Sequence, residues 1–246
     1  NQLIPETMKK IVLLLPALLL MAGSPMISQS LADVLKEHFA ATGQDNLLKV
    51  NSQKVTGLMI QSGIEIPFIQ YSKRPGKVRL EATFQGLTLI QTFNGTEGWM
   101  INPFAGVTTP QPMTEDQLRS IRYQADTDGM LWNWKDKGYQ VTLEGQEDME
   151  GTSCYKIKLV TEPGDIFTFY VDADSYVMLR QNTKMMVMGN ESENDTNFSN
   201  YMMVDGITMP GKVESKMNGQ LVMTLTFDKV EFNPELDDAL FEKPAI

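Results

Sequence analysis

Apolar and polar side chains alternate along most of the chain after Lys54. The clearest run covers residues 78–84, where every second side chain is apolar, and the same period returns over 155–159, 167–171 and 221–227. A period of two places the apolar side chains of a strand on one face and the polar ones on the other. Short turn sequences rich in Pro, Asn and Gly separate these runs. The pattern predicts an antiparallel sheet of about ten or eleven strands with one apolar face.

The last of these runs changes its parity. Leu225 and Phe227 are apolar at odd positions, whereas Val230 and Phe232 follow at even positions. One extra residue in the strand would return the apolar side chains to the same face. We therefore expect a β-bulge near Asp228.

The first helical segment precedes the strands. It begins at a capping box that runs from Ser30 to Asp33 and ends at Gly43, which is typical of a helix start and stop. The only histidine of the chain, His38, lies at the edge of its apolar stripe. We interpret His38 as a packing residue rather than a catalytic one.

The alternation stops between Pro103 and Gly138. Thr114 and Gln117 form a second capping box, and helical spacing of apolar residues follows on both sides of Gly129. We predict two short amphipathic helices within 114–137, inserted into the sheet. Their apolar side chains are Leu118, Ile121, Met130, Leu131 and Trp134.

The N-terminal residues have the pattern of an export signal. Lys9 and Lys10 precede an apolar run over 11–22, and Ser28 and Ser30 form a small-x-small cleavage pattern. The apolar run is short, so we predict a signal peptide with upstream residues over 1–30 rather than an anchor helix. The only cysteine lies far from this run, at position 154. We therefore expect a soluble mature chain without a lipid anchor.

Composition narrows the possible classes of function. Of 246 residues, 42% are hydrophobic and 21% charged, which predicts a globular protein with a substantial core. The formal net charge of -10 argues against nucleic acid as a partner, because it opposes binding to phosphates. One Cys and one His exclude zinc sites built from Cys and His and redox motifs built from paired Cys. Without any catalytic or cofactor motif, we expect neither an enzyme nor a metal or cofactor site.

One stretch of the chain carries a recognisable set of motifs. Lys-Arg-Pro at 73–75 is followed by Asn-Gly at 94–95, Trp99 and Asn-Pro-Phe at 102–104. In this order they resemble the LolA family of periplasmic lipoprotein carriers. The strand pattern and the closing segment 231–244 resemble the wider superfamily of LolA, LolB and mycobacterial lipid carriers. The likeness spans nearly all of the predicted mature chain, with motif-level detail only in the first stretch.

The resemblance implies a mainly β fold with an α lid: an unclosed antiparallel β-barrel whose concave apolar face is covered by short helices. Residues 31–246 would form a single lipid-binding domain. Arg74 would be the lid latch, hydrogen-bonded to lid backbone groups until lipid enters; without the resemblance it would be an ordinary exposed arginine. The apolar side of the alternation would line the cavity, namely Val78, Leu80, Phe84, Leu89, Phe93, Trp99, Ile157, Leu159, Phe167, Phe169, Leu225 and Phe227.

The resemblance also implies a periplasmic carrier that shuttles lipoprotein acyl chains or phospholipid from the inner to the outer membrane. Its partners would be an inner-membrane lipoprotein-releasing transporter and an outer-membrane acceptor, and we expect it to act as a monomer. The 17 Met residues would suit a cavity with adaptable walls. Two alternatives remain: a lipid- or lipoprotein-sensing module with the same fold and, with the least support, a hydrolase that uses a carboxylate pair.

Overall fold

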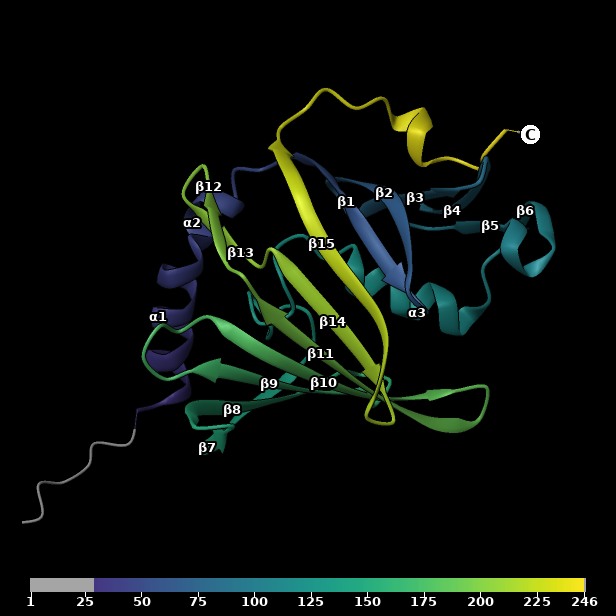
Figure 1. Cartoon of the computed structure of the whole chain (residues 1–246). Helices are drawn as coiled ribbons and strands as arrows, with labels where there is room; N and C mark the ends of the chain where they lie inside the picture. Colours follow the sequence, from purple (N-terminus) through teal and green to yellow (C-terminus); the bar gives the residue numbers. More distant parts are fainter. Residues whose placement is uncertain (1–28, 246) are drawn as a thin grey trace, which may run out of the picture.

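The computed structural model of the protein describes residues 29–245 (Figure 1). The predicted signal peptide lies outside the described residues, except for its last two positions. The helices are α1 (Leu31–Thr42), α2 (Gln44–Leu47) and α3 (Glu115–Gln124), with short 3-10 helices at Pro103–Ala105 and Asp238–Phe241. The strands are β1 (Ser52–Gln61), β2 (Ile64–Lys73), β3 (Lys77–Phe84), β4 (Leu87–Phe93), β5 (Gly98–Asn102), β6 (Val107–Pro112), β7 (Gln140–Met149), β8 (Thr152–Val160), β9 (Ile166–Asp172), β10 (Met178–Val187), β11 (Asn190–Ser199), β12 (Met202–Val204), β13 (Ile207–Met209), β14 (Lys212–Met217) and β15 (Gln220–Phe232).

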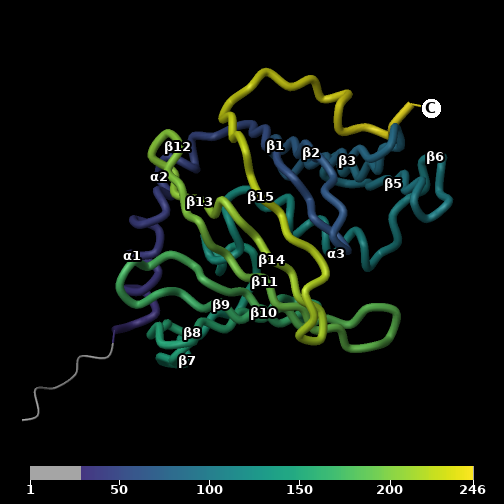
Figure 2. The backbone as a smooth tube through the Cα atoms, in the orientation of Figure 1, coloured from purple at the N-terminus to yellow at the C-terminus, as the bar shows by residue number. Residues whose placement is uncertain are grey.

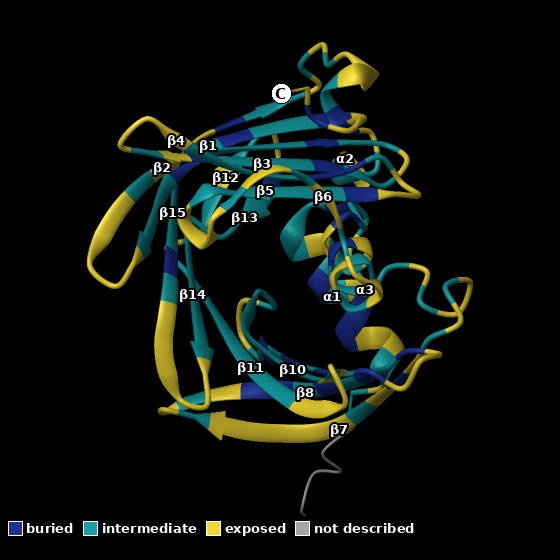
Figure 3. Ribbon diagram, turned by 90° about the vertical axis from the view of Figure 1, so that its right-hand side faces the viewer, coloured by how far each residue is buried: buried dark blue, intermediate teal, exposed yellow. Residues whose placement is uncertain are grey.

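Thirteen of the described strands form one antiparallel sheet that curls without closing. Its order is β6-β5-β4-β3-β2-β1-β15-β14-β11-β10-β9-β8-β7, so that β6 and β7 are its two edges. The first and last of the described strands, β1 and β15, pair in the middle of the sheet and join its two halves. Figure 3 shows the sheet wrapped around an interior, with α1 and α3 at its open side. The predicted unclosed barrel with helices over its concave face is confirmed.

The sheet contains more strands than the ten or eleven that alternation predicts. One reason is β11, whose sequence Asn190–Ser199 has a single apolar residue, Phe198. A strand with a single apolar residue gives no period-two signal, yet β11 pairs with β10 on one side and with β14 on the other. Its pairing is set by its neighbours and not by its own pattern.

The β-bulge expected in the last strand is present. Thr56 of β1 pairs with Lys229 and the next residue, Gly57, pairs with Phe227, so Asp228 has no partner in the ladder. The extra residue restores the inward face for Val230. This prediction from parity is confirmed.

The connection between the two sheet edges only partly agrees with the predicted pair of helices. The first helix is present as α3, with Thr114 and Gln117 in the predicted capping box. The second predicted helix, around Met130 to Trp134, is wrong: residues 126–138 form consecutive turns. Gly129 (φ 82°) and Asn133 (φ 48°) have left-handed backbone conformations, which a right-handed helix cannot contain. We call α3 and these turns, residues 115–138, the lid.

Three apolar clusters form the core. The first lies between β7–β9, α1 and the lid turns, and includes Leu35 and Ile157. The second lies between β1–β4, β15 and the β12–β13 hairpin, and includes Phe68 and Met209. The third holds α3 against β3 and β4 through Ile121. Figure 2 shows the hairpin beside α2 at the end of the sheet opposite α3.

Candidate functional site

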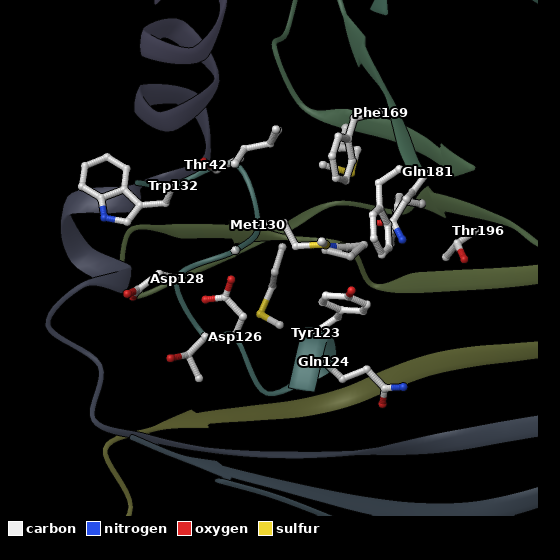
Figure 4. Close-up of a pocket in the computed structure, with 18 of the residues that line it drawn as sticks. Thr42, Tyr123, Gln124, Asp126, Asp128, Met130, Trp132, Phe169, Gln181 and Thr196 are labelled. Carbon is white, nitrogen blue, oxygen red and sulfur yellow. The ribbon is translucent and has the colours of Figure 1, made fainter. Parts of the chain in front are cut away.

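A cavity of about 730 Å³ lies on the concave side of the sheet. Its floor is the inner face of β9, β10, β11 and β14, and its cover comes from α1, the lid and the β12–β13 hairpin. Its volume falls within the roughly 300–1,000 Å³ of small-molecule sites in proteins. Figure 4 shows Met130 and Tyr123 in the middle of the lining, with Trp132 and Gln181 on opposite sides of them.

One wall of the cavity is apolar. Phe167 and Phe169 of β9 are almost fully buried, and their rings stack with centroids 6.3 Å apart. Tyr123 of α3 meets Phe167 edge to face at 5.1 Å. Met130 and Leu131 face them from the lid turns. Aromatic rings and a flexible thioether together give an adaptable apolar surface.

The floor beside this wall is polar but uncharged. β10 contributes Gln181 and Thr183, which pair across the ladder with Thr196 and Asn194 of β11. Paired residues share a face of the sheet, so these side chains all face the cavity that they line. Ser192 and Ser215 extend the same polar strip. The cavity is therefore amphipathic.

The charged groups of the lining are carboxylates with partners. Asp126 lies 2.6 Å from the ammonium of Lys137, and Asp128 lies 2.6 Å from a guanidinium nitrogen of Arg74. Lys and Arg are absent from the lining residues. His38 is 7% exposed, and burial lowers the pKa of its imidazole although a hydrogen bond to the Tyr176 carbonyl opposes this. The lining therefore presents no cation of its own at neutral pH.

Polar contacts fix the lid helix over the sheet. The Tyr123 hydroxyl donates to the buried Asp165 carboxylate at 2.7 Å, and burial raises the pKa of Tyr123 to about 12. Arg119 lies 3.2 Å from the same carboxylate and also donates to the Met186 carbonyl. Met188 donates its backbone N–H to Asp116 at 2.9 Å. These contacts join α3 to Asp165, just before β9, and to the tip of the β10–β11 hairpin.

Arg74 joins three separate segments. From the end of β2, its Nε donates to the Val50 carbonyl at 2.6 Å and its Nη2 donates to the Leu47 carbonyl of α2 at 3.2 Å. The same Nη2 forms the ion pair with Asp128 in the lid. Gln44 of α2 adds a hydrogen bond to the Asp128 carbonyl at 2.9 Å. Arg74 thus contacts the lid, in a geometry suited to the latch role, which stays a prediction.

Most of the predicted wall residues lie beside the cavity. Of the twelve, Phe167 and Phe169 line it. Ile157 and Leu159 are on the same inner face but are fully buried in the first cluster with α1. The other inward-facing residues are covered by α3 or the β12–β13 hairpin in the third and second clusters, namely Val78, Phe93, Leu80, Leu89, Leu225 and Phe227. Phe84 is the last residue of β3 and does not line the cavity.

Trp99 lies on the other side of the sheet. It pairs with Thr92, whose hydroxyl donates to the Phe241 carbonyl at 2.9 Å. Figure 1 shows that this C-terminal segment runs outside the sheet. Trp99 therefore faces away from the cavity, because paired residues share a face.

The predicted lid residues divide among three places. Met130 and Leu131 line the cavity, whereas Leu118 and Ile121 pack against β3 and β4 in the third cluster and Trp134 packs on the first. Sequence reasoning missed the polar floor of β10 and β11 and the hairpin residues Ile207 and Met209. The floor has a period of two, but only in polar residues, and hydrophobic periodicity does not detect such a strip.

Residues 29–245 contain neither a metal-binding cluster of side chains nor a helix that could span a membrane. Within this range, three or more His, Cys, Asp or Glu side chains do not gather anywhere in an arrangement that could hold a metal ion. The helices described there are too short or too polar to cross a membrane.

The fold of this chain is similar to the folds of several solved protein structures. Neither a family model nor a curated protein sequence matches the chain. A DUF1329 family protein from Desulfovibrio piger matches with a TM-score of 0.59 and 16% identity, over 85% of this chain and 97% of that one. A LolA superfamily protein from Nitrosomonas europaea matches with a TM-score of 0.59 and 13% identity, over 88% and 99% of the two chains.

A third solved structure is a Vibrio parahaemolyticus domain assigned to outer membrane lipoprotein sorting. Its TM-score is 0.53 at 10% identity, over 85% of this chain and 97% of that one. At such identities the similarity concerns the fold and not the activity. With its unclosed sheet, the lid and the cavity between them, the chain shares the fold of these three solved structures, one of which is a LolA superfamily protein.

Proposed function

We propose that the protein is a carrier that encloses lipid acyl chains in the cavity and moves them through the periplasm from the inner to the outer membrane. The observation that carries this proposal is the apolar wall under a lid, with Phe167 and Phe169 facing Met130. Each methylene removed from water contributes about 0.8 kcal/mol, so a chain of about 16 methylenes contributes on the order of 13 kcal/mol. A carrier must provide most of this favourable free energy of burial, because the acyl chain has left the membrane.

The lid provides a route for loading and release. Its turns contact α2 and the end of β2 through polar contacts from Gln44 and Arg74. By contrast, α3 is fixed to Asp165 and the β10–β11 hairpin, and the sheet beneath is held by continuous ladders. We propose that lipid entry displaces the turns around Asp128 and that Arg74 restores the closed state after delivery. The role is binding and transfer rather than catalysis.

The proposed partners belong to the same route. An inner-membrane lipoprotein-releasing transporter would load the carrier, and an outer-membrane acceptor would unload it. The similarity of fold to the outer membrane lipoprotein-sorting domain from Vibrio parahaemolyticus supports this direction of transport. The cargo would be the acyl chains of a lipoprotein or of a free lipid, and the protein would act as a monomer.

Binding is tested with a matched pair of methionines. Met130 lines the cavity, whereas Met188 is 86% exposed in the β10–β11 turn. Met130→Asp places a charge where acyl chains would lie and should weaken binding of a fluorescent diacylglycerol, which is uncharged, at least about tenfold, because an unpaired buried charge costs several kcal/mol. Met188→Asp should bind like the wild type. Equal binding by both folded variants would contradict the cavity assignment.

Transport is tested in the cell. Native mass spectrometry of protein purified from its own periplasm should show a bound lipoprotein or lipid. Cell fractionation should place the protein in the periplasm with its N-terminus near Leu31. Recovery in the membrane pellet with an uncleaved N-terminus would contradict the shuttle role.

A further inference from the structure

The cavity has a feature that acyl chains alone do not require. Its floor carries the uncharged polar strip of β10, β11 and β14, with apolar residues on both sides. Across the ladder, Gln181 lies beside Phe169 on one side and beside Thr196 on the other. Farther along, Ser215 lies between Thr196 and Met223. A hydrocarbon ligand would cover these polar groups without satisfying them, which is unfavourable.

The side chains of the strip are available to a ligand. Gln181 donates to Thr183 at 3.0 Å. The side chains of Asn194, Thr196 and Ser215 make no hydrogen bond to another described residue and are only partly exposed. Hydroxyl and amide groups can both donate and accept, so they fit esters, amides and hydroxyls equally. Figure 4 shows Thr196 and Gln181 on the same side of the cavity.

The charges around the cavity disfavour an anionic ligand. Its two acidic lining residues, Asp126 and Asp128, already use Lys137 and Arg74 as their partners. The lining residues include neither Lys nor Arg. A phosphate or a free carboxylate would meet two carboxylates and no available cation, whereas anion sites in proteins are built from such cations or from helix N-termini.

We propose that the cavity selects lipids whose polar part is uncharged and hydrogen-bonding, with esters, amides or hydroxyls placed over the polar strip, and that it rejects anionic lipids. This inference rests on the proposed function and adds the class of cargo. The glyceride and amide groups of an acylated lipoprotein N-terminus have this chemistry, and so do free diacylglycerols. The acyl chains would then lie against Phe167, Phe169 and Met130.

Binding competition on the full chain tests the selection with three probes that share the same acyl chains. These are a diacylglycerol, a triacylated lipopeptide with an uncharged peptide, and a phosphatidic acid. The two neutral probes should bind at least about tenfold more tightly than phosphatidic acid, which corresponds to one well-made hydrogen bond or one avoided repulsion. The ratio between the two neutral probes identifies the source of the cargo.

Substitutions of equal size test the strip itself. Thr183→Val combined with Thr196→Val removes two hydroxyls from the strip and should weaken diacylglycerol binding about tenfold. A pyrene-labelled hydrocarbon without polar groups should bind the double variant as well as the wild type or better. Thr168→Val is the matched control, because Thr168 of β9 lies on the outer face between Phe167 and Phe169. Thr196→Lys should raise phosphatidic acid binding.

The outcomes separate the two proposals. If hydrocarbon, neutral and anionic probes all bind alike and the double variant has no effect, the polar selection is wrong and the carrier proposal stands. If none of the probes binds to folded protein, both proposals are wrong. Preference for phosphatidic acid by the wild type would overturn the selection directly.

Discussion

At the scale of the residue, Arg74 shows how one side chain can join segments that are distant in the sequence. Its planar group reaches two carbonyls near α2 and one carboxylate in the lid. Lysine has a single ammonium on a flexible stem and cannot occupy three sites in such a fixed arrangement. The motif around Arg74 could be recognised from the sequence. Its partner Asp128 could not, because only the fold brings the two together.

Replacing Arg74 tests its role as a latch. Arg74→Leu removes hydrogen bonds from a charged donor, each of which contributes about 1.5–3 kcal/mol. We expect faster amide exchange of residues 126–138 in the empty protein, tighter retention of lipid and slower transfer to acceptor membranes. Arg74→Lys keeps the charge near Asp128 and should give an intermediate result. If Arg74→Leu transfers lipid at the wild-type rate, Arg74 is not a latch and is an ordinary arginine at the end of a strand.

His38 makes stability depend on pH. Burial lowers the pKa of His38 below its ordinary value of 6.5, so between the folded and the unfolded pKa the unfolded chain binds more protons. The contribution of neutral His38 to the free energy of unfolding should be fully present above about pH 6.5. It should decrease, by up to about 1.4 kcal/mol per pH unit, as the pH falls toward the pKa of His38 in the folded protein. Urea unfolding between about pH 5 and 7.5 measures this. His38→Asn should flatten the dependence of stability on pH, since the chain has no other histidine. If the slope is unchanged in this variant, the pH dependence comes from the carboxylates and not from His38.

At the scale of the element, local signals were sufficient wherever local chemistry decides the structure. Both capping boxes and the bulge at Asp228 are present as predicted. Alternation also identified the inner face of β3 and β15. It could not show what covers that face, because α3 and the β12–β13 hairpin reach it only through the topology. Side chains such as Leu80 and Phe227 were therefore assigned to the cavity although protein covers them.

The two capping boxes offer a matched test of the lid. Thr114 caps α3 in the lid and Ser30 caps α1 against the first cluster, both with the same reciprocal contacts. Loss of an N-cap costs about 1 kcal/mol, which increases local opening about fivefold. Thr114→Ala should speed both amide exchange in α3 and the release of bound lipid. Ser30→Ala should affect only α1. If both variants release lipid at the wild-type rate, α3 does not move during release.

At the scale of the whole molecule, the lid spans the opening that the sheet leaves between its edges. The chain leaves β6, passes through α3 and the turns, and enters β7 at the opposite edge. The lid and the sheet edges are therefore parts of one continuous segment. On the other side of the cavity, the β12–β13 hairpin fills the concave face through Met202, Val204 and Met209. The cavity is therefore bounded by two covers, the lid and the β12–β13 hairpin, and a large cargo would contact both.

The volume of the cavity predicts how the molecule responds to cargo of different size. A group of the size of a water molecule occupies roughly 30 Å³, and a methylene is of similar size. The cavity of about 730 Å³ therefore holds about two dozen methylenes. One acyl chain fits this space, whereas three long chains, about 45 methylenes in total, do not. A triacylated lipopeptide should therefore displace the hairpin as well as the lid.

Hydrogen exchange measured by mass spectrometry distinguishes these states. With an uncharged single-chain lipid bound, such as a fatty alcohol, exchange should change only over the lid, residues 115–138. With the triacylated lipopeptide, residues 202–209 should also exchange faster, because the hairpin gives up its contacts with the second cluster. Strand β8 is the internal control: it pairs on both sides, and Ile157 and Leu159 are fully buried, so its protection should be constant. A bound lipopeptide with no change over 202–209 would mean that the sheet edges separate instead and that β6 and β7 lose protection.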